Sequence, residues 1–246
     1  MRYFIKFSYN GTKYHGWQIQ PNAISVQEIL TRSLSVILNE QIVLTGAGRT
    51  DSGVHAKEMY AHFDADSKIE IPVIIHKVNS FLPKDVVVLD FYLVADDAHA
   101  RFDAKKRTYQ YYINTVKNPF LQDQSWFYHS KLDVNLMNEA AKLLHNHIDF
   151  KSFSKSNTDV NTHNCTIFKA IWIIEDNQLI FTITADRFLR NMVRSIVGTL
   201  ILIGLHKISL IDFNAIIESK NRTEAGFSVP AHGLYLTKIE YDFINQ

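Results

Sequence analysis

Gly46-Ala47-Gly48-Arg49-Thr50-Asp51-Ser52-Gly53-Val54-His55-Ala56 is a stretch whose composition fits neither a helix nor a strand. Glycine lets the backbone turn sharply and lets a ligand approach closely. A lone Asp51 in such a loop is therefore typical of a carboxylate presented for function. The alternative is a tight connection in which Asp51 caps a turn, because aspartate is common in glycine-rich turns.

The same loop begins like a dinucleotide-binding fingerprint, with glycines at positions 46 and 48. The third glycine of that fingerprint would fall at position 51, where the chain has Asp51. A carboxylate there would place negative charge against a pyrophosphate. The sequence therefore disfavours a nucleotide-binding fold.

The residues around the loop predict a βαββαβ order for the first half of the chain. Residues 2–9, 42–44, 59–63 and 86–94 have strand-like composition. Ser25 with Glu28 forms a capping box ahead of an apolar helical face, and Pro72 can open a second helix. Residues 11–17, between the first strand and the first helix, are a loop bracketed by glycines.

The second half repeats this order. We expect strands at 107–114, 167–174, 179–184 and 234–241, and helices after Asp133, over 187–204 and after Ser209. The prediction is an α+β fold of two tandem ferredoxin-like, RNA-recognition-like halves with a mainly antiparallel sheet and a central cleft. We expect domains at 1–104 and 105–246, and a mobile insertion at 152–166.

Bulk composition indicates an ordinary globular chain of 246 residues, 46% hydrophobic and 12% aromatic. Lys6 interrupts the first apolar stretch, and the apolar run 196–205 is about half the length of a membrane span, so we expect a cytoplasmic protein. The single Cys165 allows no internal disulfide, and the histidines lack metal-site spacing. No metal is expected.

Two basic clusters stand out against a net charge of +1. The first contains Arg101, Lys105, Lys106 and Arg107; the second contains Arg187, Arg190 and Arg194, which would share a helical arc. Tyr109 and Tyr111 would share one strand face with Arg107, whereas Tyr112 would lie on the opposite face. Aromatic faces with basic neighbours stack bases and hold phosphates in RNA-binding folds, although such tyrosines can equally be core residues.

Inside the helix expected over 187–204, Gly198 is unfavourable by about 1 kcal/mol relative to alanine. A close backbone contact is the usual reason for such a glycine.

Five segments together resemble the tRNA pseudouridine synthase A family over nearly the whole chain. They are residues 48–56 (GRTDSGVHA), 99–102 (HARF), 107–111 (RTYQY), 188–198 (FLRNMVRSIVG) and 233–236 (GLYL). The first and fourth are the specific ones. Ser52 stands where family members commonly have alanine, and residues 152–166 match weakly.

The resemblance implies a homodimeric enzyme without a cofactor that converts uridine to pseudouridine at positions 38, 39 and 40 of the tRNA anticodon stem-loop. It implies that Asp51 is the catalytic aspartate, that Tyr109 stacks on the target uracil and that Arg194 pairs with Asp51. Arg49 would help hold the flipped nucleotide.

Further substrate contacts are expected from the two basic clusters, through Arg101, Arg107, Arg187 and Arg190 to phosphates. His55 and the loop at 11–16 are also candidates for RNA contact, with a packed histidine and a simple turn as the alternatives.

Two other classes of protein compete with this interpretation. A non-catalytic RNA-binding module would use the same tyrosines and arginines but would not need Asp51. A glycosidase-like hydrolase would also act at a sugar C1′, but it usually needs a second carboxylate nearby, and the glycine-rich loop offers one.

Overall fold

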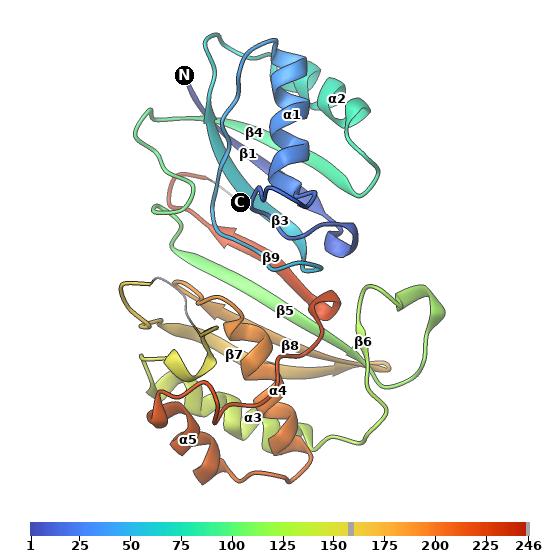
Figure 1. The fold of residues 1–246 in the computed structure, drawn as a ribbon, viewed down its shortest axis with the longest axis vertical. Coiled ribbons are helices and arrows are strands. Elements are labelled where there is room, and N and C mark those ends of the chain that lie inside the picture. Colours follow the sequence, from blue (N-terminus) through green and yellow to red (C-terminus); the bar gives the residue numbers. More distant parts are fainter. Residues whose placement is uncertain (157–159, 245–246) are drawn as a thin grey trace. The chain divides into compact units, whose positions relative to one another are not determined.

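The computed structural model describes residues 1–156 and 160–244, which divide into two compact units (Figure 1). Unit 1 comprises Met1–Lys105 together with the C-terminal segment from Leu236, and unit 2 comprises Lys106–Tyr235. The chain therefore leaves unit 1 once and returns to it near the C-terminal end of the described sequence.

Unit 1 is built on antiparallel strands. Its strands are β1 (Arg2–Tyr9), β2 (Thr45–Gly46), β3 (His55–Asp64), β4 (Val86–Val94) and the unit 1 part of β9 (Leu234–Glu240). Their order is β4-β1-β3-β9, and β2 pairs with one end of β3. The predicted strand at 86–94 is confirmed, and the one at 59–63 lies in the C-terminal half of the longer strand β3.

Unit 1 has two helices, α1 (Val26–Leu38) and α2 (Ile71–Phe81), and α2 packs on both β4 and α1. Ser25 caps α1 by accepting the Glu28 N–H at 3.2 Å, and α2 begins with Pro72 in its first turn, both as predicted. Phe4 of β1 lies edge-on to Tyr241 and Phe243, with ring centroids 5.3 and 5.4 Å away. The C-terminal segment thus contributes the buried Tyr241 ring to the core of unit 1.

The strand predicted at residues 42–44 is wrong, since the short strand β2 comes later. The Ile42 N–H donates to Ser35 Oγ at 3.0 Å, and the Leu44 carbonyl accepts from Gln27 Nε2 at 2.8 Å. Because side chains of α1 satisfy these backbone groups, the segment lies against the helix and does not join a ladder.

Unit 2 has strands in the order β5-β8-β7: β5 (Lys106–Asn114), β8 (Gln178–Ala185) and β7 (Ile167–Glu175). These pairs are antiparallel, and the short β6 (Trp126–Phe127) pairs with β5 in parallel. The strands predicted at 107–114, 167–174 and 179–184 are confirmed within one residue at each end.

The helices of unit 2 are α3 (Val134–Leu143), α4 (Met192–Gly204) and α5 (Leu210–Ser219), and α3 packs on both β7 and α4. The predicted caps are present: the Asp133 side chain accepts the Leu136 N–H at 3.0 Å, and Ser209 accepts the Asp212 N–H at 3.1 Å. Unit 2 also contains short 3₁₀ turns at Pro119–Leu121, Leu144–Asn146, Lys151–Phe153 and Ala231–Gly233. Unit 1 has a similar turn at Gly11–Lys13.

The helix predicted to begin at Arg187 begins five residues later. Asp186 Oδ1 accepts the backbone N–H groups of Thr166 and Arg187 at 2.8 and 2.7 Å, which holds this stretch in a non-helical path. Asn191 then adopts φ 68°, a left-handed conformation that asparagine tolerates better than most residues. Arg187 and Arg190 therefore lie outside α4, and the predicted helical arc of three arginines is wrong.

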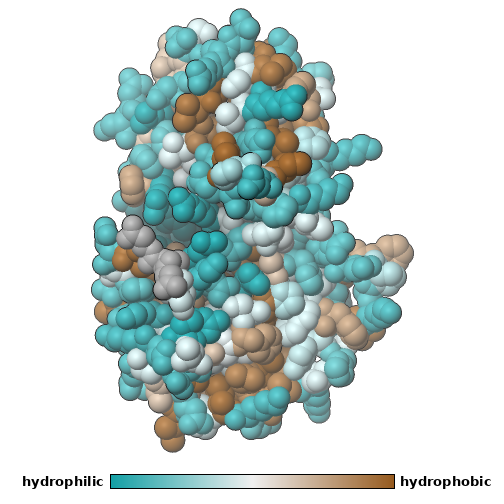
Figure 2. Space-filling model, in the orientation of Figure 1, coloured by the Kyte–Doolittle hydropathy of each residue, from teal (hydrophilic) through white to brown (hydrophobic). Residues whose placement is uncertain are grey.

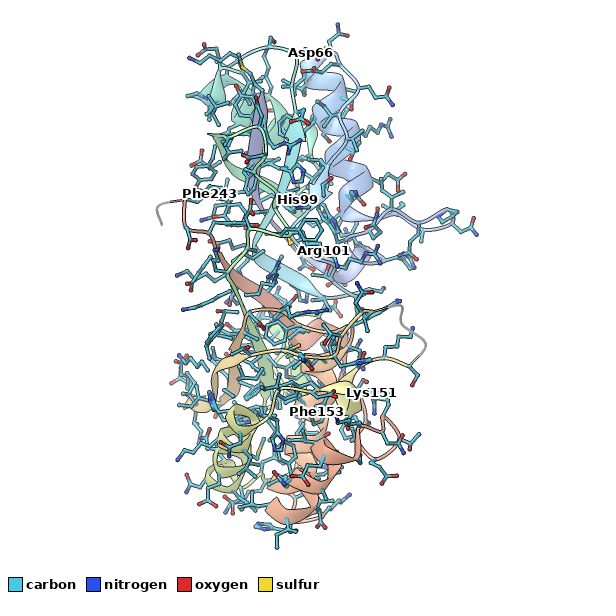
Figure 3. The ribbon with its side chains drawn as sticks, turned by 90° about the vertical axis from the view of Figure 1, so that its left-hand side faces the viewer. Asp66, His99, Arg101, Lys151, Phe153 and Phe243 are labelled. Atoms are coloured by element: carbon cyan, nitrogen blue, oxygen red, sulfur yellow. The ribbon has the colours of Figure 1, made fainter. Side chains whose placement is uncertain are left out.

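The described ends of the insertion predicted at 152–166 pack against the rest of unit 2 (Figure 3). Phe153 and Cys165 are buried, and Ser152 Oγ donates to the Ile216 carbonyl at 2.7 Å. The middle of the segment, 157–159, lies outside the described residues, so its predicted mobility stays a prediction.

The fold class is confirmed in its broad form, because both units mix helices with mostly antiparallel strands. The tandem ferredoxin-like arrangement and the domains 1–104 and 105–246 stay predictions. Hydrophilic side chains cover most of the face shown in Figure 2, with hydrophobic ones scattered among them. Within the described ranges, no helix is long and apolar enough to cross a membrane.

Candidate active site

Asp51 lies partly buried in the loop between β2 and β3, and the loop is held by its own backbone. The Val54 N–H donates to the Asp51 carbonyl at 3.1 Å, which closes a turn around the carboxylate. The Gly53 N–H donates to the Tyr14 carbonyl at 3.2 Å, and the Thr50 carbonyl accepts from the Trp17 N–H at 3.3 Å. Residues 14–17 therefore support the Asp51 loop directly.

Gly16 of this supporting segment and Gly11, which precedes the segment, permit the close approach. Gly16 has φ +86°, and a Cβ on it would collide with the Thr50 carbonyl oxygen. A Cβ on Gly11 would collide with the Val54 carbonyl oxygen in the same way. Sequence reasoning left residues 11–16 as a candidate RNA contact or a simple turn, but the segment packs under the loop that carries Asp51.

Side chains complete the support of the loop. The Tyr9 hydroxyl shares a hydrogen bond of 2.8 Å with Thr50 Oγ1. His55 is 1% exposed, and its Nδ1 accepts the Gly11 N–H at 3.1 Å. An Nδ1 that accepts a hydrogen bond carries no proton, so this geometry fits a neutral ring. His55 thus joins the supporting segment to the start of β3, and substrate contact by its side chain stays a prediction.

The two other predicted residues of unit 1, Arg49 and Arg101, are exposed. Arg49 precedes Asp51 by two residues in the same loop. Arg101 belongs to the turn that follows β4, beside His99 (Figure 3), and its guanidinium carbon lies 5.7 Å from the centre of the Phe102 ring. These arginines therefore lie in different segments of unit 1.

In unit 2, the two tyrosines on one face of β5 have different environments. Tyr109 is partly exposed, and its ring lies edge-on to Phe188 with centroids 5.1 Å apart. Tyr111 is fully buried and its hydroxyl donates to the Pro230 carbonyl at 2.8 Å, and burial raises the pKa of that phenol. Tyr111 is therefore a core residue, while Tyr109 retains exposed ring surface.

Arg107 and Arg187 meet at Asp186, next to Tyr109. Arg107 Nη1 donates to the Asp186 carbonyl at 2.7 Å, and the Arg187 N–H is held by the Asp186 side chain. Arg190 is exposed, and its carbonyl accepts the Lys155 N–H at 2.9 Å. Although the expected helical arc is absent, the Arg107 guanidinium reaches Asp186, the residue before Arg187, and the ring of Phe188, the residue after Arg187, contacts the partly exposed Tyr109.

Arg194, in the first turn of α4, is held by the segment 228–230. Its Nε donates to the Val229 carbonyl at 2.7 Å, and its own carbonyl accepts the Val229 N–H at 3.3 Å. Ser228 Oγ accepts from Asn191 Nδ2 at 2.6 Å and from Arg222 Nη2 at 3.1 Å. The Nε side of the Arg194 guanidinium is therefore held by a backbone carbonyl that is distant in sequence.

The close backbone contact predicted at Gly198 is confirmed, because a Cβ there would collide with the Phe227 carbonyl oxygen. This contact brings the segment 227–230 against α4.

A histidine that sequence reasoning missed lies near this arginine. Burial lowers the pKa of His232 from its ordinary value, and the positive charge of Arg194 acts in the same direction. No sequence pattern around His232 indicates this position. Within the described residues no group of His, Cys, Asp and Glu side chains is arranged to hold a metal ion.

The whole chain is similar to known proteins of one family. The protein named tRNA pseudouridine synthase A of Porphyromonas gingivalis is 51% identical over 244 residues, which cover 98% of this chain and 97% of that protein. The chain belongs to the tRNA pseudouridine synthase A family. The protein of the same name from Bacteroides fragilis is 52% identical over 242 residues, covering 98% and 96% of the two chains.

A more distant tRNA pseudouridine synthase A, from Clostridium acetobutylicum, is 41% identical over 239 residues, covering 96% of this chain and 98% of that protein. A family model described as tRNA pseudouridine synthase matches residues 140–242. Membership makes the chain an enzyme, an isomerase that acts on tRNA, and confirms the resemblance read from the sequence. The roles of Asp51, Tyr109, Arg194 and the other arginines within this enzyme stay predictions.

Proposed function

We propose that the chain converts uridine to pseudouridine at positions 38, 39 and 40 of the tRNA anticodon stem-loop, with Asp51 as the essential carboxylate. The observation that carries this proposal is the way the Asp51 loop is built. Two glycines, a buried histidine and a tyrosine hydroxyl hold a single partly exposed carboxylate in place. A turn that served only to connect two strands would not need this support.

The chemistry requires an ionised carboxylate at the sugar of the target nucleotide. The bond between C1′ and N1 must break, the uracil must rotate, and a bond between C1′ and C5 must form while the C5 proton leaves. Asp51 would either add to C1′ or take the proton from C2′. Both routes use one carboxylate and need no cofactor.

The remaining predicted residues supply binding and orientation. Arg194 would pair with Asp51 and favour its charged form. Tyr109, the exposed tyrosine of β5, would stack on the detached uracil and keep it from escaping. The target base must leave the stem, which is easiest where a stem meets a loop, and Arg49 would hold the flipped nucleotide. Arg101, Arg107, Arg187 and Arg190 would contact phosphates, and His55 would act by supporting the loop.

The proposal also includes the assembly and the setting of the enzyme. It would act in the cytoplasm as a homodimer, in which each chain folds as two tandem ferredoxin-like halves with a central cleft. The antiparallel order β4-β1-β3 with β2 beside β3, and the helices between these strands, support the ferredoxin-like part for unit 1.

The test is release of tritium from a tRNA transcript labelled at uracil C5, because this release reports formation of the new C5 bond. We expect release by the wild type and none above background by Asp51→Ala. Asp66→Ala is the matched control, because Asp66 is an exposed carboxylate of unit 1 outside the loop (Figure 3). Transcripts that retain a uridine at only one of positions 38, 39 and 40 then test the choice of site.

Each result has a different meaning. No release by the wild type from several tRNAs would favour a non-catalytic RNA-binding module. Release by Asp51→Ala would remove Asp51 from the catalytic role while leaving the enzyme class intact. Free uracil among the products would point to hydrolysis.

The role of Tyr109 can be tested separately with Tyr109→Phe. The ring remains and the hydroxyl is lost, so we expect unchanged tRNA affinity and a turnover lower by about 100-fold if the hydroxyl helps to remove the C5 proton. Single-turnover rates and binding curves measure the two quantities. Unchanged turnover would limit Tyr109 to stacking.

A further inference from the structure

Several hydrogen bonds fix the backbone of the turn at residues 99–103 of unit 1. The His99 N–H donates to Asp103 Oδ2 at 2.7 Å, and the Asp103 N–H donates back to the His99 carbonyl at 3.0 Å. His99 Nδ1 accepts the N–H groups of both Arg101 and Phe102, at 3.1 and 3.3 Å. Four of the five backbone N–H groups from 99 to 103 are thus hydrogen-bonded within the turn, and the fifth is that of Ala100.

The Ala100 N–H is bonded as well, to a residue outside the turn. It donates to Nδ1 of His62 on β3 at 3.1 Å, and the Ala100 carbonyl accepts the Tyr241 hydroxyl at 2.6 Å. The turn is therefore fastened both to β3 and to the C-terminal segment of unit 1. Its backbone has little freedom to lose when a ligand binds.

This fixed turn presents an aromatic side chain to solvent. Phe102 is 74% exposed, although the His99 ring lies 4.2 Å from it between centroids and the Arg101 guanidinium 5.7 Å from it. The hydrogen bonds of the turn use the backbone at 102 and the side chains of His99 and Asp103. None of them needs an aromatic ring at position 102, so the core of unit 1 does not explain the phenylalanine.

The turn is fastened near the C-terminal end of β3, whereas the tight turn from Asp51 to Val54 directly precedes the N-terminal end of the same strand. β3 begins at His55, four residues after Asp51, and His62 is seven residues further on. At about 3.3 Å per residue, His55 and His62 are about 23 Å apart along the strand. A nucleotide bound at Phe102 would therefore not be the one whose sugar lies at Asp51.

We propose that Phe102 and Arg101 form a second RNA-binding site, in which the Phe102 ring stacks on an unpaired base of the tRNA and Arg101 binds the adjoining phosphate. This inference rests on the proposed function, since it takes tRNA as the substrate. Bases inside a helix are already stacked on their neighbours, so an exposed protein ring can stack only on a base in a loop or bulge. The site would hold the tRNA at a point away from the reacting uridine.

The experiment compares Phe102→Ala with Phe120→Ala. Phe120 is 86% exposed and lies in unit 2, outside the residues assigned to binding. Stacking of one base on an aromatic residue predicts that Phe102→Ala weakens tRNA binding by roughly ten-fold, and Phe120→Ala should bind like the wild type. In tritium-release assays KM should rise by a similar factor with kcat unchanged, because binding away from the reacting base is equal in ground and transition states.

Three further variants separate stacking from other contributions. Phe102→Trp keeps a flat ring and should bind as the wild type does, whereas Phe102→Leu should lose nearly as much as Phe102→Ala. Arg101→Ala should lower the slope of log Kd against log salt by about one, and Phe102→Ala should leave the slope unchanged.

The inference is overturned if Phe102→Ala binds tRNA like the wild type, or if Phe102→Leu does so, because any apolar side chain would then suffice. Failure of the proposed function is a separate result: the wild type itself would release no tritium. Melting temperatures of all variants establish that the comparison is made on folded protein.

Discussion

Asp51 in unit 1 and Arg194 in unit 2 are held in different ways. The Asp51 loop rests on backbone atoms of residues 14–17, and a Cβ added at Gly16 would collide with the Thr50 carbonyl oxygen. Arg194 is held through its own Nε and through side chains, with Ser228 Oγ accepting from both Asn191 and Arg222.

The difference predicts opposite sensitivities to mutation. A loop held by close backbone contacts is damaged by an added Cβ, whereas a residue held by side-chain hydrogen bonds is damaged by their removal. The Asp51 loop should therefore be sensitive to substitution of Gly16, and the position of Arg194 to removal of the polar side chains that hold residues 228–230. Three predictions test this contrast, from the largest expected effect to the smallest, and a fourth concerns the pH dependence of unit 1.

Gly16→Ala should have the largest effect. The new Cβ would meet the Thr50 carbonyl, and φ +86° is strained for alanine, so the loop must move. Since displacement of a reactive group by about 1 Å can cost about 100-fold in rate, we expect a loss of that order in kcat.

Gly48→Ala is the matched control in the same loop, because a Cβ on Gly48 would meet no atom within 4 Å. Its kcat, measured by tritium release, should stay within about three-fold of the wild type. Equal kcat values for the two alanine variants would show that the close contact at Gly16 does not position Asp51.

Ser228→Ala should have a smaller effect. It removes the acceptor shared by Asn191 Nδ2 and Arg222 Nη2, while the Val229 carbonyl still accepts from Arg194. Loss of an acceptor for partly buried donors typically costs about 1–3 kcal/mol, so the melting temperature should fall. We expect about a ten-fold loss in kcat from looser positioning of Arg194, and Ser228→Thr, which keeps the hydroxyl, should recover most of it.

Tyr111→Phe should be milder again. Its hydroxyl holds the Pro230 carbonyl, next to the residue that binds Arg194. A single hydrogen bond of this kind contributes about 1 kcal/mol, measurable by urea unfolding. If activity falls as steeply as in Tyr109→Phe, Tyr111 would have a chemical role and the assignment of these two tyrosines would need to be exchanged.

The last prediction concerns the pH dependence of unit 1. Burial lowers the pKa of His62 from its ordinary value near 6.5 to about 4, with the nearby His99 adding to the shift. The folded state therefore favours neutral His62, and this contribution to stability is complete above pH 6.5 and declines as the pH falls towards 4. Free energies of unfolding should show this decline in the wild type and less of it in His62→Gln.

If the two proteins lose stability in parallel between pH 6.5 and 4, protonation of His62 does not contribute to acid unfolding. His62→Gln should still unfold cooperatively at pH 7, which verifies that the comparison starts from the folded state.

Local features of the fold were predictable from the sequence. The caps Ser25, Asp133 and Ser209 mark helix starts through hydrogen bonds that span three residues, and such signals are contained in a short window. The beginning of α4 was not predictable in this way. It depends on Asp186 binding the N–H of Thr166, a residue twenty positions earlier, and on the left-handed conformation of Asn191.

The candidate site shows the same limit. The composition of residues 46–56 pointed to Asp51, but the contact between Gly16 and Thr50 joins positions that no local pattern connects. Period-two alternation put Tyr109 and Tyr111 on one face of a strand. Their division into an exposed and a buried residue depends on Pro230, which is supplied by a segment far along the chain.

The return of the chain to unit 1 has a consequence for protein synthesis. The part of β9 that lies beside β3, together with Tyr241, leaves the ribosome only after all of unit 2. Until then, β3 has no β9 partner, and the aromatic rings that the residues after β9 bring to Phe4 are missing. The nascent first unit would therefore present an incomplete sheet edge, a surface on which chaperones act, for as long as unit 2 is being translated.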